Sequence, residues 1–152
     1  MKKAIIPILF ISLVMMSCTC SKKQQANETV LEFSSADVWQ LTHIRGSKVT
    51  YSNSEPVTIQ FNTESGTING FAGCNRFFGN YINKVADTPE SGTQGEISFT
   101  GVGATKMMCP EAEMRIEDKF LPLIEKSTRY SLSKYTLVIY QKDKEVMRFE
   151  KQ

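Results

Sequence analysis

The chain has 152 residues, of which 41% are hydrophobic, and its 18 basic residues stand against 16 acidic ones. Lys2 and Lys3 belong to a segment that we expect to be removed, and without them the two signs of charge balance. This length accommodates one domain with its own core. Balanced charge gives no support to nucleic-acid binding, so we expect no nucleic-acid partner.

The first seventeen residues predict a targeting segment. Two lysines precede an apolar run at residues 4–16. The run is shorter than the roughly 20 apolar residues that a membrane-spanning helix needs, and it suits a signal peptide. Ser17 precedes Cys18, an order that resembles a bacterial lipobox, in which the cysteine carries the lipid. The alternative is a plain secretory signal that is cut nearby.

Residues 18–35 predict a flexible tether. They are rich in Ser, Lys, Gln, Asn and Glu and contain few apolar residues. Such a segment stays extended and would hold a domain away from a membrane surface. Cys20 is the poorer candidate for lipidation, because Cys18 and Thr19 would precede it. Residues 36–152 then form the folded domain.

Short strands are expected to dominate that domain. Trp39, Leu41 and His43 alternate with polar residues, which places them on one face of a strand. The run at residues 57–61 alternates most clearly and indicates a half-buried strand. Further strands are expected near residues 67–72, 79–82, 97–99, 130–132, 137–140 and 147–149. A polar loop is predicted at residues 84–95, where proline and two glycines interrupt the pattern.

One helix is expected after Cys109-Pro110. Acidic residues follow the proline, as is typical of a helix N-terminus, and apolar residues at helical spacing extend to Ile124. Pro122 would remove one hydrogen bond and crowd the carbonyl of Asp118. We therefore expect a kink or an early, irregular end at this position.

These elements predict a mainly β fold, because consecutive strands with short links pair antiparallel. We expect a small antiparallel barrel or a strongly curled sheet of about eight strands, with one helix packed on it. Closing the sheet would remove its exposed edges. The predicted core consists of Trp39, Ile59, Phe61, Ile97, Phe99, Phe120, Leu137 and Phe149.

The glycine-rich stretch at residues 69–81 predicts a tight, partly buried corner between two strands. It combines three glycines and three asparagines with four aromatic residues and Cys74. Its glycines do not have the G-x-G-x-x-G spacing of a phosphate-binding loop. Asn75 is expected to bond nearby backbone, and Arg76 either pairs with a carboxylate or exposes a binding surface.

Two motifs resemble the META domain family, which includes HslJ-like heat-shock lipoproteins. Gly73-Cys74-Asn75-Arg76-Phe77 is similar to the family signature, and the segment from Ala104 to Cys109 is similar to its Thr-Arg-Met-Met-Cys element. Lys106 departs from the family's usual arginine. The resemblance covers about residues 38–149. It implies the same fold class and a role in the bacterial envelope, connected with stress or drug tolerance, but no established reaction.

Cys74 and Cys109 are candidates for a disulfide, because an exported chain meets an oxidising compartment. The alternative is two buried free thiols that pack as small apolar groups. A zinc site is not expected, since the chain has no C-x-x-C pair and His43 is its one histidine. We expect no metal and no cofactor.

The sequence leaves three classes of function open for this protein. The first is a non-catalytic, monomeric lipoprotein anchored at Cys18, facing the periplasm from the outer membrane and contacting an unknown envelope protein or small ligand. The second is a small-ligand-binding β-barrel lipoprotein, which an ordered cavity of several hundred cubic ångströms would support. A thiol-based enzyme comes last, because nothing in the sequence places Cys74 or Cys109 beside His43.

Overall fold

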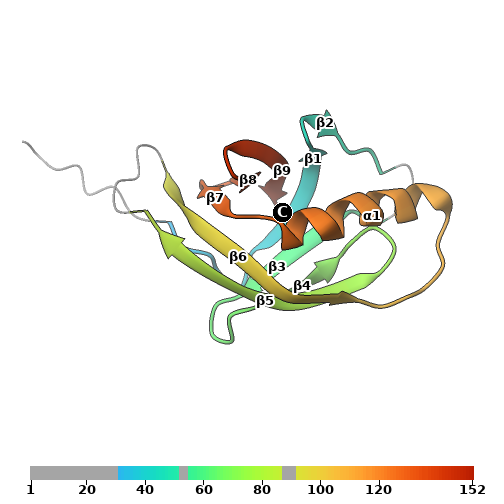
Figure 1. The fold of residues 1–152 in the computed structure, drawn as a ribbon, viewed down its shortest axis with the longest axis horizontal. Coiled ribbons are helices and arrows are strands. Elements are labelled where there is room, and N and C mark those ends of the chain that lie inside the picture. The colour runs from blue at the N-terminus through green and yellow to red at the C-terminus, as the bar shows by residue number, and fades with distance from the viewer. Residues whose placement is uncertain (1–30, 52–54, 87–91) are drawn as a thin grey trace, which may run out of the picture.

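The computed structural model describes residues 31–51, 55–86 and 92–152. They form a closed antiparallel barrel of eight strands with a single helix, which confirms the predicted fold class (Figure 1). The predicted signal peptide, the lipidation residue Cys18 and most of the predicted tether lie outside the described residues.

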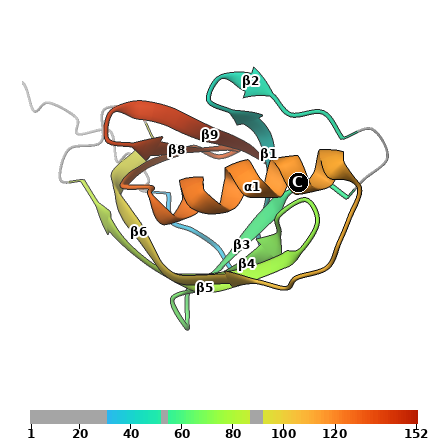
Figure 2. The same cartoon turned by 45° about the vertical axis from the view of Figure 1, so that its right-hand side comes forward.

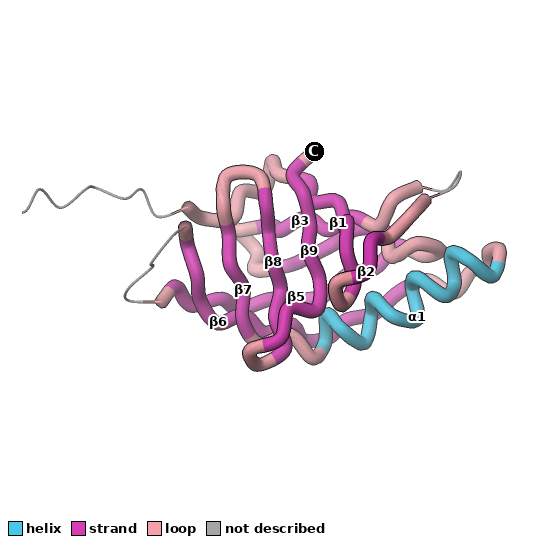
Figure 3. The backbone as a smooth tube through the Cα atoms, turned by 90° about the horizontal axis from the view of Figure 1, so that it is seen from above, coloured by secondary structure: helices cyan, strands magenta, loops and turns pink. Residues whose placement is uncertain are grey.

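Nine strands are present in the described residues, and all except β2 follow each other around the barrel in chain order. They are β1 (Val38–Ile44), β2 (Ser47–Lys48), β3 (Thr58–Asn62), β4 (Thr67–Phe71), β5 (Arg76–Val85), β6 (Thr93–Ala104), β7 (Arg129–Leu132), β8 (Thr136–Gln141) and β9 (Lys144–Lys151). Helix α1 (Glu111–Glu125) lies between β6 and β7. Pairing of β1 with β9 closes the barrel, while β2 extends β1 outside it as a short hairpin (Figure 3).

The core fills the interior of the barrel. All eight predicted core residues are buried, with no more than 5% of their surface exposed, so that prediction is confirmed. Helix α1 crosses the space that the strands enclose (Figure 2) and contributes Phe120, Leu123 and Ile124 to the core. The Phe120 ring lies 5.1 Å from the Phe77 ring and 6.4 Å from the Phe149 ring, centre to centre. The helix therefore closes one end of the barrel with apolar side chains.

Strand β1 follows the predicted alternation only in its first half. Trp39 and Leu41 are buried as expected, but His43 is half-buried and Ile44 takes the inward position. The pairing with β9 shifts register between Leu41 and His43. An extra residue at such a bulge moves the following side chains to the opposite face. The prediction that His43 shares a face with Trp39 and Leu41 was therefore wrong.

Two further expectations differ from the structure. Of the two outcomes expected at Pro122, a kink or an early end, the early end does not occur, because the helix continues to Glu125. Pro122 and Asp118 are both exposed, so the carbonyl that loses its hydrogen bond remains accessible to solvent. Strand β6 begins at Thr93 and is 12 residues long, because it pairs with both β5 and β7.

The packed part of the chain begins before residue 36, where the domain was expected to start. Phe33 is 7% exposed, and its ring stacks on that of Phe61 at 4.1 Å. The backbone N–H of Leu31 donates to Oγ1 of Thr93 at 2.6 Å. The end of the predicted tether thus covers the Phe61 side of the core. Every residue of the core cluster lies between Phe33 and Phe149.

Candidate functional site

The glycine-rich motif forms a buried corner between β4 and β5. Residues 72–75 make the turn, and the N–H of Ala72 donates to the carbonyl of Asn75 at 2.8 Å. Gly73 has a φ of 117°, and a Cβ on it would lie 3.1 Å from the carbonyl oxygen of Glu113. A side chain is disfavoured there by both the backbone conformation and the closeness of α1. The corner therefore packs directly on the first half of the helix.

A disulfide joins this corner to the segment before the helix. Cys74 and Cys109 have Cα atoms 5.7 Å apart and are bonded through sulfur. The two family-like motifs thus meet in space, although they are 35 residues apart in the chain. With both sulfur atoms in this bond, neither cysteine carries the thiolate that a nucleophile requires.

Asn75 and Glu117 form a hydrogen-bond network beside the disulfide. The backbone N–H of Asn75 donates to Oε2 of Glu117 at 2.6 Å, and Nδ2 of Asn75 donates to Oε1 at 2.9 Å. Oδ1 of Asn75 accepts from the Thr105 hydroxyl at 2.9 Å and from the N–H of Met107 at 2.7 Å. Asn75 is 3% exposed, so these bonds satisfy a buried amide. The network holds corner, connecting segment and helix together.

Sequence reasoning missed Glu117. Its carboxylate also accepts the backbone N–H of Cys74 at 3.3 Å. A tight buried corner leaves backbone donors without partners in its own strands, and a nearby carboxylate can satisfy them. A tight corner predicts that some acceptor must bind its backbone N–H groups. The sequence does not tell which acidic residue supplies that acceptor.

The other two polar candidates lie apart from this network. Arg76 begins β5 with an exposed side chain, and within the described residues no carboxylate lies within ion-pair distance of it. His43 sits on β1, and its Nδ1 is 3.0 Å from the hydroxyl of Thr42. The structure therefore brings Cys74, Cys109 and Asn75 together, whereas Arg76 remains free to expose a surface.

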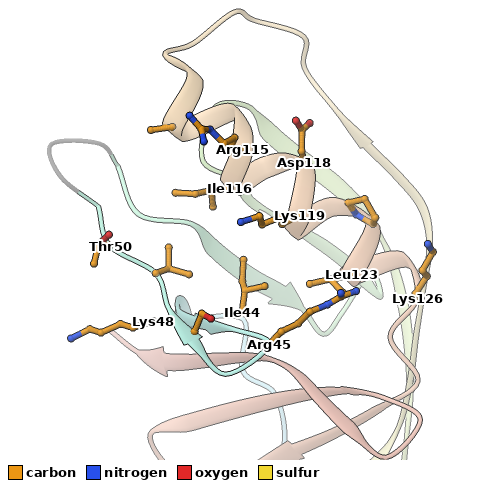
Figure 4. Close-up of a pocket in the computed structure, with 14 residues that line it drawn as sticks. Ile44, Arg45, Lys48, Thr50, Arg115, Ile116, Asp118, Lys119, Leu123 and Lys126 are labelled. Carbon is orange, nitrogen blue, oxygen red and sulfur yellow. The ribbon is translucent and has the colours of Figure 1, made fainter.

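A groove of about 750 Å³ lies outside the barrel, between α1 and the β1–β2 hairpin with the residues that follow it (Figure 4). Its volume falls in the range of small-molecule sites, roughly 300–1,000 Å³. The predicted ligand-binding alternative required a cavity of this size, but the interior of the barrel is filled by the core. The groove is therefore an external site, and the sequence did not single out its residues as a binding site.

The groove has apolar side chains facing basic ones. Among the described residues that line it, five are basic and one, Asp118, is acidic. In Figure 4, Ile116 and Lys119 of α1 face Ile44 and Arg45 of the hairpin, whereas Asp118 points away from the hairpin. This distribution makes the groove electropositive and suits a ligand that carries negative charge.

Tyr51 fixes the segment that follows the hairpin. Its hydroxyl donates to the carbonyl of Leu41 in β1 at 3.0 Å. Burial raises the pKa of Tyr51 to about 12, because the charged form would lose hydration. Val49 and Thr50, which line the groove, immediately precede this residue. The position of the groove wall thus depends on a neutral, hydrogen-bonded tyrosine.

The described residues contain neither a cluster of metal ligands nor a membrane-spanning helix. Nowhere in residues 31–51, 55–86 and 92–152 do three His, Cys, Asp or Glu side chains gather as metal ligands would. No helix in the described part of the chain is both long and apolar enough to cross a membrane.

Comparison with known proteins identifies a domain and a fold. The family model for the META domain matches residues 29–152. A protein from Burkholderia xenovorans solved by NMR is 22% identical, with a TM-score of 0.59, and the match covers 86% of this chain and 97% of that one. A second NMR structure is 23% identical, with a TM-score of 0.55 and coverage of 76% and 89%. At these identities the two structures support the fold alone. No curated protein matches the chain.

Proposed function

Because the chain belongs to the META domain family, we propose that it is a non-catalytic lipoprotein of the bacterial cell envelope, anchored through Cys18. The observation that carries this proposal is the order of the leader: two lysines, an apolar run, Ser17 and then Cys18. A single acyl chain binds a membrane only marginally, so stable anchoring needs the several chains that lipoproteins carry.

The proposed location is the outer membrane, with the domain facing the periplasm. By analogy with Gram-negative sorting, an aspartate after the lipidated cysteine retains a protein at the inner membrane, and this chain has Thr19. The domain would work there as a monomer, in stress or drug tolerance, through contacts with an envelope protein or a small ligand.

Two features support a non-catalytic role. Cys74 and Cys109 share a disulfide, so a thiol nucleophile would first require reduction. The buried amide of Asn75 is fully engaged in bonds that hold the corner to the helix. The most distinctive residues of the sequence therefore serve the fold, and a structural explanation accounts for them without a reaction.

Metabolic labelling with a palmitate analogue tests the anchor. We expect labelled protein from the wild type and from Cys20→Ala, but not from Cys18→Ala. Membrane fractionation should place the labelled forms in the outer membrane and release Cys18→Ala into the soluble fraction. Equal labelling of wild type and Cys18→Ala would refute anchoring at this residue. In a strain that lacks the gene, only the anchored forms should restore survival under heat or antibiotic stress.

A second candidate function is binding of a small ligand. The specific observation in its favour is the groove of about 750 Å³ between α1 and the β1–β2 hairpin. This candidate is compatible with the anchor, since a lipoprotein can hold a binding domain at a membrane. It places the ligand outside the barrel rather than in the interior.

A further inference from the structure

We infer that the groove between the β1–β2 hairpin and α1 binds a small organic anion with an aliphatic body, such as a medium-chain carboxylate. The inference deepens the ligand-binding candidate by naming the ligand class. It rests on residues of the barrel domain alone and does not depend on lipid anchoring.

The apolar part of the groove suits an alkyl chain. Ile44 and Val49 come from the hairpin side, and Ile116 and Leu123 come from α1. Ile44 is 8% exposed and Leu123 is 4% exposed, so both are fixed by the core beneath them. No aromatic ring is among the described residues that line the groove. An aliphatic chain can therefore remove its surface from water against rigid aliphatic side chains.

The charged part of the groove suits an acid group. Arg45 comes from the hairpin wall and Lys119 from the α1 wall. In Figure 4 the guanidinium lies beside Leu123 and the ammonium points toward Ile116, so positive charge flanks the groove at two places. A guanidinium can bind a carboxylate with two parallel hydrogen bonds, and an ammonium adds a point charge. Lys126 lies at the end of the same groove, beyond Leu123. Arg115 contributes less, because it pairs with Glu111 at 2.9 Å.

The backbone of Arg45 is a second, independent observation. Arg45 and Gly46 form the two-residue turn between β1 and β2, with φ values of 48° and 78°. Both central residues of such a turn need a positive φ, which favours asparagine or glycine and disfavours arginine. Keeping arginine at this position has a conformational cost, and it places the guanidinium beside the groove. Costly backbone conformations of this kind are often found at functional sites.

The position of the groove favours a soluble ligand over the lipid of an anchoring membrane. The described chain enters the domain at Leu31, beside the start of β6. In Figure 1 this point lies at the left, whereas β2 and the beginning of α1 lie toward the right. The elements that line the start of the groove, β2 and the beginning of α1, thus lie apart from the point at which a membrane tether would join the domain.

The binding test uses a chain that starts at Ser21 and so retains every residue of the core cluster. Decanoate, kept below its micelle concentration, is titrated against the nitrogen-15-labelled chain and followed by amide chemical shifts. We expect saturable shifts at Ile44, Val49, Ile116 and Leu123. Decyltrimethylammonium has the same alkyl chain with the opposite charge, and it should bind at least about tenfold more weakly. Added salt should weaken decanoate binding.

Variants separate charge from folding. Arg45→Asn combined with Lys119→Gln should weaken decanoate binding by about tenfold or more. Arg45→Lys keeps the charge and should retain most of the affinity. Lys142→Asn is the matched control, because Lys142 also has a positive φ, of 56°, in the β8–β9 turn but does not line the groove. It should leave binding unchanged. Asparagine suits both turns, so the variants are expected to fold, and thermal unfolding of each one separates loss of charge from loss of structure.

Three results would overturn the inference. The first is an absence of saturable shifts in the groove, and the second is equal affinity for the anionic and cationic amphiphiles. The third is binding to phosphatidylglycerol vesicles with none to free decanoate, which would make the groove a membrane contact instead. Failure of lipid labelling at Cys18 would leave the inference intact, because the chain used here lacks that residue.

Discussion

Helix α1 lies between two tight turns that differ in burial and in their bonds to the helix. On one side, the corner at residues 72–75 is buried, crosslinked through Cys74 and hydrogen-bonded to Glu117. On the other side, the Arg45–Gly46 turn is exposed, and a groove separates its hairpin from the helix. The corner is conspicuous in the sequence and serves the fold. The hairpin is inconspicuous and supplies the charges of a candidate binding site.

This difference teaches that a recognisable motif need not be the functional surface. The corner uses glycine, asparagine and cysteine because close packing against α1 demands small residues, satisfied amides and a crosslink. The groove needs only basic and aliphatic residues, which are common on any domain. Changes to the corner should therefore alter stability, and changes to the hairpin should alter binding.

The largest expected effect is at the disulfide. Replacing both Cys74 and Cys109 by alanine should lower the free energy of unfolding by roughly 4 kcal/mol in the chain-entropy description. The bond closes a loop across a separation of 35 residues. Urea unfolding of the chain that starts at Ser21 measures the loss. Reducing agent should destabilise the parent and leave the double variant unchanged.

A thiol count provides the matching check on the same crosslink. The parent chain from Ser21, unfolded without reductant, should show no free thiol. Two free thiols, or a stability loss below about 1 kcal/mol, would contradict the crosslinked corner. The corner would then be held by hydrogen bonds alone.

The next largest effect on stability is expected at Glu117, whose carboxylate accepts the backbone N–H groups of the corner. Glu117→Gln should destabilise the domain by about 1–3 kcal/mol, because a neutral amide is a weaker acceptor for the N–H groups of Cys74 and Asn75. Glu125→Gln is the control on the exposed side of α1 and should stay within about 0.5 kcal/mol. Equal effects of the two changes in urea unfolding would show that the network contributes nothing specific.

At the β1–β2 hairpin, a substitution is expected to raise the free energy of unfolding instead of lowering it. Arg45→Asn should stabilise the domain by up to about 1 kcal/mol, because asparagine tolerates the left-handed conformation better than arginine. Arg45→Lys keeps both the charge and the conformational cost, so it should give no gain. Thermal unfolding of the three proteins compares them directly. A destabilised Arg45→Asn would mean that the arginine side chain supports the fold.

The last prediction is a dependence on high pH at the wall of the groove. The pKa of Tyr51 is about 12 in the folded protein and about 10 when unfolded. The unfolded state therefore loses its proton first, and this contribution to stability is present below pH 10 and declines between pH 10 and 12. Tyr51→Phe should flatten that part of the decline in urea unfolding. An unchanged decline in the variant would assign it to other groups.

The fold could be predicted to the extent that it depends on local pattern. Alternation at residues 57–61 located β3, and helical spacing located α1. The bulge in β1 could not be predicted, because it arises from pairing with β9 at the far end of the chain. The length of β6 likewise depends on its two partners rather than on its own glycine-containing sequence.

The candidate sites were predictable only in part, for a related reason. Cys74, Cys109 and Asn75 stood out by residue type, and the structure places them together. Glu117 did not stand out, since its partner Asn75 is 42 residues away and carboxylates are frequent on helices. The groove has one wall from the segment after β1 and the other from α1. A surface assembled from distant segments leaves no local pattern to recognise.

The pairing of β1 with β9 determines when the barrel can close during synthesis. The last strand pairs with the first folded strand, and the N–H of Gln152 reaches the carbonyl of Val38 at 3.0 Å. The barrel therefore cannot close until the ribosome has added β9. Contacts between segments so distant in sequence form slowly, because the intervening chain must first be ordered. A chain whose first and last barrel strands pair in this way keeps an open sheet edge on β1 until β9 has left the ribosome.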